Sequence, residues 1–397
     1  MPRLIRDPQL DELVRELNEG DGAAPAGALT SSAIVPEGNE LERLLNDMAQ
    51  RGASDLHIVA GSPPIYRING ALAKSDRAAL SPEEIHTLIA PVVTGRSLER
   101  LNAGDAVDFS LRLSRAVNED DRRAWRFRVN VHRQRGTIAA AIRALPTEVP
   151  SVAHLHLPAS LAELVKPTRG LVLVCGPTGS GKTTTLAALV GEINRTASRH
   201  IITIEDPIEY EHRNASSVIE QVEVGRDASS FASALRAALR QDPDVILVGE
   251  MRDLETVSTA ITAAETGHLI LSTLHTSDVA QAIHRIIDVF PPAQQQQIRQ
   301  QLSLALNAVI VQHLIPRSGG NGRAVAVEVM IANNAIRNHI RNDKLQNLTT
   351  EITLGKRAGM ISLEDSLTGL VKQGLITADD ARGRASRLDE FESLMRG

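Results

Sequence analysis

One short segment of the chain has the residue types and spacing of a phosphate-binding site. Residues 176–183, Gly-Pro-Thr-Gly-Ser-Gly-Lys-Thr, fit the pattern G-x-x-x-x-G-K-[ST] of a nucleotide phosphate-binding loop. Glycines let the backbone curl so that its N–H groups face phosphate oxygens, and Lys182 can reach the β- and γ-phosphates. The hydroxyl of Thr183 is the kind of group that holds Mg²⁺ in such loops. The segment therefore predicts a site for a nucleoside triphosphate and Mg²⁺.

The elements predicted on either side of this loop are the ones that such a loop requires. The apolar run 171–175 is typical of a buried strand, and residues 184–194 carry apolar side chains at helical spacing. A helix that starts at the loop adds the positive end of its dipole to the backbone N–H groups. We predict nucleotide contacts from nine consecutive residues: Gly176, Pro177, Thr178, Gly179, Ser180, Gly181, Lys182, Thr183 and Thr184.

Hydrolysis of a nucleotide also needs carboxylates for Mg²⁺ and for the attacking water, and two glutamates are suitably placed. Glu205 follows the strand-like run 201–204, and Glu250 follows the strand-like run 245–248. In open α/β sheets, sites form outside the carboxyl ends of the strands, so both carboxylates are predicted at the same edge as the loop. Either cluster alone is equally typical of a solvated acidic turn. Their shared position after buried strands favours a catalytic site.

Two histidines flank the next predicted strand, residues 269–271. His275 lies towards its carboxyl end, where a group that senses the γ-phosphate would be placed. His268 lies at the amino end and is not assigned to the site. No third ligand is placed by spacing, so the two histidines do not predict a metal site.

Arginines in the first half of the chain offer a positive charge for the phosphates. In residues 125–131, period-two alternation places Arg126 and Arg128 on one polar face of a strand. Arg143 lies on the following predicted strand. Either these side chains meet an anion, in their own chain or in a neighbouring one, or they solubilise the surface of a sheet. Spacing alone leaves both interpretations open.

Composition restricts the class of protein. The net charge of −5 and the aromatic content of 2% argue against a nucleic-acid partner, which would need a basic surface and stacking platforms. The single cysteine, Cys175, permits neither a disulfide nor a cysteine zinc site within the chain, which fits a reducing cytoplasm. No apolar run approaches 18 residues, and the N-terminus lacks the pattern of a signal peptide.

The chain, at 397 residues, has room for several domains. Residues 1–38 are predicted to be a flexible extension and linker, rich in Gly, Ala, Pro and Ser after residue 19. Residues 39–148 alternate between helical and strand patterns and predict an α+β domain. An interdomain linker is expected at 149–168. Residues 169–397 predict an α/β domain with a parallel sheet covered on both faces, followed by a helical part.

Together these segments resemble the secretion and pilus ATPase superfamily, and within it the PilT-like retraction ATPases of type IV pili. The resemblance runs from about residue 39 to the C-terminus. It is carried by six motifs: 52–57 (GASDLH), 126–130 (RFRVN), 176–183, 203–209 (TIEDPIE), 246–253 (ILVGEMRD) and 267–276 (GHLILSTLHT). Two more segments, 287–291 (IDVFP) and 335–338 (AIRN), point to the PilT-like proteins in particular.

The resemblance implies an α/β fold with a PAS-like N-terminal domain, a RecA-like ATPase domain and a helical C-terminal part. It implies a homo-hexameric ring that hydrolyses ATP with Mg²⁺ and powers pilus retraction in twitching motility. The implied partner is an inner-membrane pilus platform protein, with a second retraction ATPase as a further possibility. The implied location is the cytoplasm, at the inner membrane through the pilus machine.

The resemblance also implies roles for individual residues. Lys182 and Thr183 would bind phosphate and Mg²⁺, and Glu250 would support Mg²⁺ or the attacking water. Five side chains would act in catalysis, with the arginines as fingers: Glu205, Glu250, His275, Arg128 and Arg143. Which glutamate is the general base stays open.

The chain departs from the family pattern at several points. Thr183 replaces the more usual serine and keeps the hydroxyl. Residues 271–276 resemble pilus extension and secretion ATPases as much as PilT, so those functions, and an accessory retraction role, stay as alternatives. Residues 1–38 and the charged loop at 119–123 are longer than the family's compact form. The extension and secretion ATPases usually carry a four-cysteine zinc module, which one cysteine excludes.

Overall fold

The computed structural model describes residues 33–35, 38–68, 70–93, 95–113, 125–320 and 322–396. The chain divides into two compact units, one of Met1–Ala116 with Val129–Ile142 and one of Val117–Arg128 with Arg143–Gly397. Within the described residues there are two sheets, each of seven strands. The charged loop at 119–123 and most of the extension at 1–38 lie outside the described residues.

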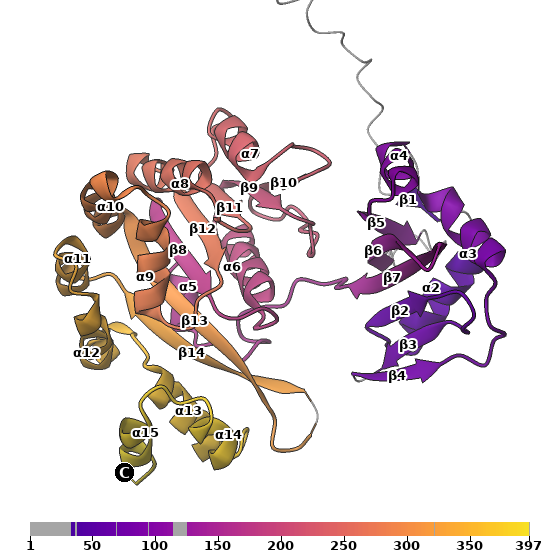
Figure 1. Ribbon diagram of the computed structural model, residues 1–397. Coiled ribbons are helices and arrows are strands. Elements are labelled where there is room, and N and C mark those ends of the chain that lie inside the picture. Colours follow the sequence, from indigo (N-terminus) through magenta and orange to yellow (C-terminus); the bar gives the residue numbers. More distant parts are fainter. Residues whose placement is uncertain are drawn as a thin grey trace, which may run out of the picture. The chain divides into compact units, whose positions relative to one another are not determined.

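The first sheet has the strand order β1-β5-β6-β7-β2-β3-β4 (Figure 1). Its strands are β1 (Ala33–Ile34), β2 (Asp55–Ile58), β3 (Ile65–Ile68), β4 (Ala71–Lys74), β5 (Val107–Leu113), β6 (Trp125–Gln134) and β7 (Thr137–Leu145). Its helices are α2 (Glu40–Gln50), α3 (Pro82–Ile89), η1 (Ala90–Val92) and α4 (Gly95–Ala103). The apolar stripe of α2 is buried, and α3 begins with a capping box between Ser81 and Glu84, as the serine and proline at its start predict.

The second sheet has the strand order β10-β9-β11-β12-β8-β13-β14. Its strands are β8 (Gly170–Cys175), β9 (His200–Glu205), β10 (Val218–Glu223), β11 (Val245–Val248), β12 (Leu269–Leu274), β13 (Leu306–Pro316) and β14 (Arg323–Ile331). Neighbouring strands pair in parallel except β13 and β14, which form an antiparallel hairpin. The predicted parallel pairing of β8, β9, β11 and β12 is confirmed, and the β13–β14 hairpin adds an antiparallel edge to the sheet. An antiparallel pair needs only a short connection, which residues 317–322 provide.

Helices cover both faces of the second sheet (Figure 1). They are α5 (Ser160–Glu163), α6 (Lys182–Thr196), α7 (Phe231–Ala238), α8 (Leu254–Thr266), α9 (Val279–Asp288) and α10 (Pro292–Ala305). One apolar cluster joins the sheet to α7–α10, and a second joins the other face to α5 and α6. Every residue of β8, β11 and β12 is buried, which explains the continuous apolar runs of β8 and β11. The two polar residues of β12, Ser272 and Thr273, bond to carbonyls near the end of β11.

The C-terminal part is helical, as its sequence predicts. It contains α11 (Asn334–Arg341), η2 (Leu345–Asn347), α12 (Leu348–Leu354), η3 (Gly355–Ala358), α13 (Leu363–Lys372), α14 (Ala378–Arg382) and α15 (Leu388–Arg396). A separate small core packs Leu367 of α13 and Phe391 of α15 with Ile315 and Ala326 of the β13–β14 hairpin. The expected α/β fold class, with its α+β first part, its ATPase-type sheet and its helical end, is confirmed. None of the described helices is long and apolar enough to cross a membrane.

Candidate nucleotide site

The loop at 176–183 has the conformation that its sequence predicts. It leaves the end of β8, and α6 begins at Lys182 with Gly181 as its N-terminal cap. Gly176 adopts φ +143°, and a Cβ at this position would lie 2.4 Å from the Gln312 carbonyl oxygen. Both the left-handed backbone and the close approach therefore require glycine. The first residue of the loop therefore packs closely against the backbone of β13, the strand next to β8.

Gln312 on β13 holds the loop in place, and sequence reasoning missed it. Its buried side chain accepts a hydrogen bond from the Thr185 hydroxyl at 2.7 Å and donates one to the Ser180 carbonyl at 2.6 Å. These bonds join the loop and the first turn of α6 to one amide group. The available signal was a polar residue directly after the apolar run 308–311.

Lys182 and His275 meet at the loop. The Lys182 Nζ donates hydrogen bonds to the carbonyls of Gly176 (2.9 Å) and Pro177 (3.0 Å) and lies 3.4 Å from the His275 Nδ1. Burial lowers the pKa of the Lys182 ammonium. Burial and the charges of Lys182 and Arg252 lower the pKa of the His275 imidazole, which favours its neutral form. The neutral ring can accept or donate a hydrogen bond beside the positive lysine.

Glu205 ends β9 with its carboxylate almost buried. The carboxylate accepts hydrogen bonds from the Thr203 hydroxyl (2.8 Å) and from the Gln221 amide (3.2 Å). Burial raises the pKa of the Glu205 carboxyl, the charge of Glu209 adds to this effect, and the two hydrogen bonds oppose it. A carboxylate with a raised pKa is a stronger base, which suits a group that must attract a proton from water.

Glu250 lies just beyond β11 in a different environment. Its carboxylate pairs with the Arg252 guanidinium at 2.7 Å, and its side chain is 26% exposed. The preceding Gly249 donates its N–H to the Ile204 carbonyl, and its own carbonyl accepts from the Thr273 hydroxyl at 2.6 Å. These bonds fix the end of β11 between β9 and β12. Glu250 therefore projects from a rigid backbone with a side chain accessible to ligands.

A single cavity of about 1110 Å³ collects the groups predicted at the strand ends. Its walls include residues 178–179 and 181–187, with Glu205, Glu250, Thr273 and His275. The Tyr210 hydroxyl also lies on this wall and donates to the Thr184 hydroxyl at 3.1 Å. His268 faces the Ala263 carbonyl at the opposite end of β12, outside this group. Among the described residues, no three His, Cys, Asp or Glu side chains gather into a metal-binding cluster.

The two predicted finger arginines lie on strands of the first sheet. Arg128 is on β6 and Arg143 is on β7, at the two places where the chain passes from one compact unit to the other. Their action on a nucleotide stays a prediction. The same holds for the domain boundaries expected at 39–148, 149–168 and 169–397.

The loop between β8 and α6, with carboxylates at the ends of adjacent parallel strands, defines the P-loop nucleoside triphosphatase class. The sequence model described as type II/IV secretion system protein matches residues 34–361, and the chain belongs to this family. The chain is 43% identical over 352 residues to the type IV pilus retraction ATPase PilT of Pseudomonas aeruginosa, covering 89% of this chain and 100% of that protein.

Two further comparisons agree. The chain is 43% identical over 333 residues to the twitching motility protein of Neisseria gonorrhoeae, covering 84% of this chain and 87% of that protein. A crystal structure of the pilus retraction motor PilT with bound ADP matches with a TM-score of 0.81 at 47% identity, covering 89% of this chain and 99% of that one. The expected membership of the secretion and pilus ATPases and the resemblance to PilT are confirmed.

Replacing Gln312 with leucine should weaken both the fold and nucleotide binding. The change leaves the Ser180 carbonyl and the Thr185 hydroxyl without their buried partner. We expect a loss of about 1–3 kcal/mol in the free energy of unfolding for each unsatisfied group, together with a several-fold rise in the KM for ATP. Denaturant unfolding and steady-state kinetics would measure the two effects.

The matched control is Gln301→Leu. Gln301 also bonds a side chain through its amide, but its partner is Glu265 on α8, away from the loop. The KM for ATP should not change in this variant. Equal KM values for the two variants would contradict the role assigned to Gln312.

Proposed function

We propose that this chain is a Mg²⁺-dependent ATPase that powers the retraction of type IV pili. The observation that carries the proposal is the gathering of Lys182, Glu205, Glu250 and His275 around one phosphate-binding loop. The similarity of the chain to PilT extends over nearly the full length of PilT, and it supports pilus retraction as the function. An intact set of phosphate-handling and water-handling groups favours an active enzyme.

The residues present suit a triphosphate and its metal ion. The backbone N–H groups of the loop and the Lys182 ammonium would hold the phosphates. The Thr183 hydroxyl and the Glu250 carboxylate are hard oxygen ligands of the kind that Mg²⁺ takes alongside water and phosphate oxygens. When bound, Mg²⁺ neutralises charge on the phosphates and orients them. Two protein ligands are enough, so the site does not need a larger cluster.

The remaining groups would act on the water and on the developing charge. The Glu205 carboxylate would orient the attacking water and accept its proton, since burial raises its basicity. His275, beside Lys182, would contact the γ-phosphate and report whether it is present. Arg128 and Arg143 would supply positive charge as the γ-phosphate leaves.

The proposed assembly is a homo-hexameric ring in the cytoplasm, held at the inner membrane by the pilus machine. Its output would be a change in the angle between the two domains of each subunit as ATP is hydrolysed. That motion would turn an inner-membrane platform protein and let pilin return to the membrane. A second retraction ATPase is a further proposed partner.

Deletion of the gene tests the direction of the work. If the gene encodes a retraction ATPase, its deletion should leave cells hyperpiliated and without twitching motility, because pilus extension continues without retraction. Electron microscopy of surface pili and a twitching assay would measure both. Complementation with the wild-type gene should restore motility, and complementation with a Lys182→Ala variant should not.

If the deletion strain instead lacks surface pili, the chain is a pilus extension ATPase. If piliation is unchanged and protein secretion is lost, the chain is a secretion ATPase. The extension alternative rests on residues 271–276, Leu-Ser-Thr-Leu-His-Thr. Against both alternatives stands the single cysteine, which cannot form the zinc module that those ATPases usually carry. Retention of piliation control with partial loss of motility would indicate an accessory retraction ATPase.

A further inference from the structure

A buried glutamate outside the phosphate-binding loop contacts the segment that follows His275. Glu328 lies on β14 and is 9% exposed. Its Oε2 accepts a hydrogen bond from the backbone N–H of Val279, the first residue of α9, at 3.3 Å. Period-two alternation puts Glu328 on the same face of the sheet as Met330, which packs in the cluster that contains Ile283 of α9. The carboxylate therefore fixes the start of α9 against the sheet.

The start of α9 determines where His275 can lie. β12 ends at Leu274, and only residues 275–278 connect it to Val279. The strand end is immobilised, because the Ser272 and Thr273 hydroxyls donate to the carbonyls of Val248 and Gly249 at 2.7 and 2.6 Å. The connection is thus held at one end by β12 and at the other by α9. A change at the α9 end moves the backbone that carries the His275 ring.

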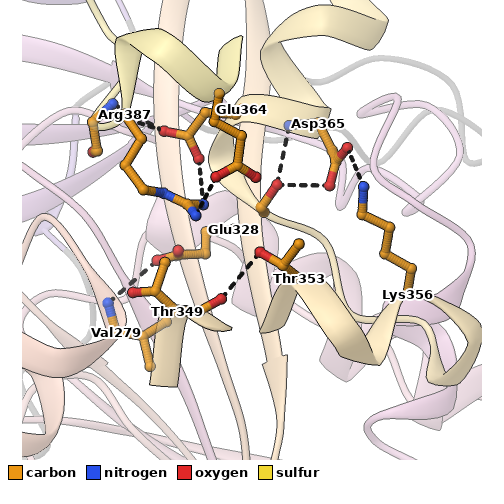
Figure 2. A network of polar contacts seen from close by, with 11 residues as sticks. Val279, Glu328, Thr349, Thr353, Lys356, Glu364, Asp365 and Arg387 are labelled. Carbon is orange, nitrogen blue, oxygen red and sulfur yellow. Dashed lines mark hydrogen bonds and ion pairs between the residues drawn. The ribbon is translucent and has the colours of Figure 1, made fainter. Parts of the chain in front are cut away.

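Glu328 is also next to a charged pair in the C-terminal helices. Glu364 of α13 is 1% exposed and accepts hydrogen bonds from the N–H groups of Ser386 and Arg387 at 3.1 and 2.9 Å. Its second oxygen pairs with the Arg387 guanidinium at 2.7 Å. Figure 2 shows Glu328, Glu364 and Arg387 in one group, with Val279 on the other side of Glu328. This pair ties α13 to the segment before α15.

The electrostatics of Glu328 reflect these neighbours. Burial raises the pKa of its carboxyl to about 7; the charges of Asp278 and Glu364 act in the same direction, and the hydrogen bond from Val279 and the charge of Arg387 oppose them. Asp278 belongs to the connection after His275 and also caps α9, by accepting from the Gln281 N–H at 2.8 Å. One carboxyl group therefore senses charges on the His275 connection and on the C-terminal helices.

We propose that Glu328 is a positioning residue that couples the C-terminal helices α13–α15 to the placement of His275, and so sets the rate of ATP hydrolysis. The proposal rests on the proposed function, in which His275 contacts the γ-phosphate. A displacement of α13 or α15 shifts Arg387 and Glu364, changes the interaction of Glu328 with Val279, and moves the connection 275–278. The C-terminal helices thereby act on turnover without touching the nucleotide.

The test compares Glu328→Ala, Glu328→Gln and wild type as full-length proteins, using Mg²⁺-ATP hydrolysis and binding of a fluorescent ADP analogue. Because the loop is not altered, ADP affinity and the KM for ATP should stay within about twofold, while misplacement of His275 should lower kcat by about tenfold or more in the alanine variant. The glutamine variant should recover most of kcat, since its amide oxygen can still accept from the Val279 N–H.

Asp365→Ala is the control, placed in α13 next to Glu364. Asp365 accepts from the α13 cap Ser362 at 2.6 Å and pairs with Lys356 at 2.7 Å, and neither partner belongs to the connection after His275 (Figure 2). It should lower thermal stability without lowering kcat. If Glu328 affected kcat only by stabilising the fold, Glu328→Ala and Asp365→Ala would lose the same amount of kcat for the same fall in melting temperature.

Arg387→Met supplies the second arm. The Arg387→Met variant should lower kcat. The double variant with Glu328→Ala should be no slower than Glu328→Ala alone, because Arg387 acts on His275 through Glu328. Should Glu328→Ala fail to fold, Glu328→Gln and Arg387→Met carry the test. Wild-type kcat in folded Glu328→Ala, or independent effects of the two substitutions, overturns the coupling. Absence of ATP hydrolysis in the wild type would instead overturn the proposed function.

Discussion

The Lys182→Ala variant should lose nearly all ATPase activity while keeping the wild-type fold. In the wild type, Lys182 is 7% exposed, and its ammonium group donates hydrogen bonds to the Gly176 and Pro177 carbonyls. Among the described residues that line this cavity, Lys182 is the only lysine, so alanine removes the ammonium group that the loop itself holds. We expect kcat/KM to fall by about 10²–10³-fold or more, the usual effect of deleting one transition-state contact to a transferring group.

The measurement is phosphate release under saturating Mg²⁺, with circular dichroism to verify the fold. Lys166→Ala is the control, because Lys166 lies in the same compact unit but forms an exposed pair with Glu163 at 2.6 Å. It should hydrolyse ATP at the wild-type rate. Normal turnover by Lys182→Ala would refute the site itself, because every other role depends on phosphates bound at this loop.

The parts of this site that sequence predicts are those set by local chemistry. The loop at 176–183 requires its glycines wherever it occurs, and the fully buried strands β8 and β11 are apolar on both faces. Parallel strands put their carboxyl ends at one edge, which explains why Glu205 and His275 could be expected near Lys182. In the structure, Lys182, Glu205 and His275 line one cavity.

The parts that sequence missed depend on contacts between distant segments. β13 follows α10 without a turn residue between Ala305 and Leu306, so its apolar run continues the helical pattern. Gln312 therefore could not be placed beside Ser180, which is 132 positions away. β10 was missed because it is an edge strand in which three of the six residues are polar, so neither an apolar run nor a regular alternation marks it. The role of Glu328 was also not predicted from sequence, because its hydrogen-bond partner Val279 is 49 positions away in the chain.

Of the two glutamates, Glu205 should prove to be the general base. Its carboxylate is buried and hydrogen-bonded to the neutral side chains of Thr203 and Gln221, whereas that of Glu250 pairs with Arg252. Glu205→Gln should lower kcat by about 10²–10⁴-fold with nucleotide affinity retained. Glu250→Gln should instead raise the Mg²⁺ concentration needed for half-maximal activity, because it removes a metal ligand. Titration of Mg²⁺ at saturating ATP separates these outcomes.

The pH profile of kcat provides an independent test. A general base works in its ionised form, so kcat falls as the pH falls through its pKa. Burial raises the pKa of Glu205, and the fall should therefore begin at a higher pH than for an ordinary glutamate. Thr203→Val removes a hydrogen bond that stabilises the carboxylate, so this variant should move the acidic limb to still higher pH.

Glu220→Gln is the matched control for the pH profile. Glu220 lies on the neighbouring β10 and contacts His200 at 3.3 Å, at the other end of the strand from Glu205. Its removal should leave the acidic limb unchanged. An acidic limb that stays in place in Thr203→Val but moves in Glu250→Gln would transfer the role of base to Glu250. Because the Thr203 hydroxyl donates to Glu205, the variant in which the acidic limb moves identifies which carboxylate takes the proton from water.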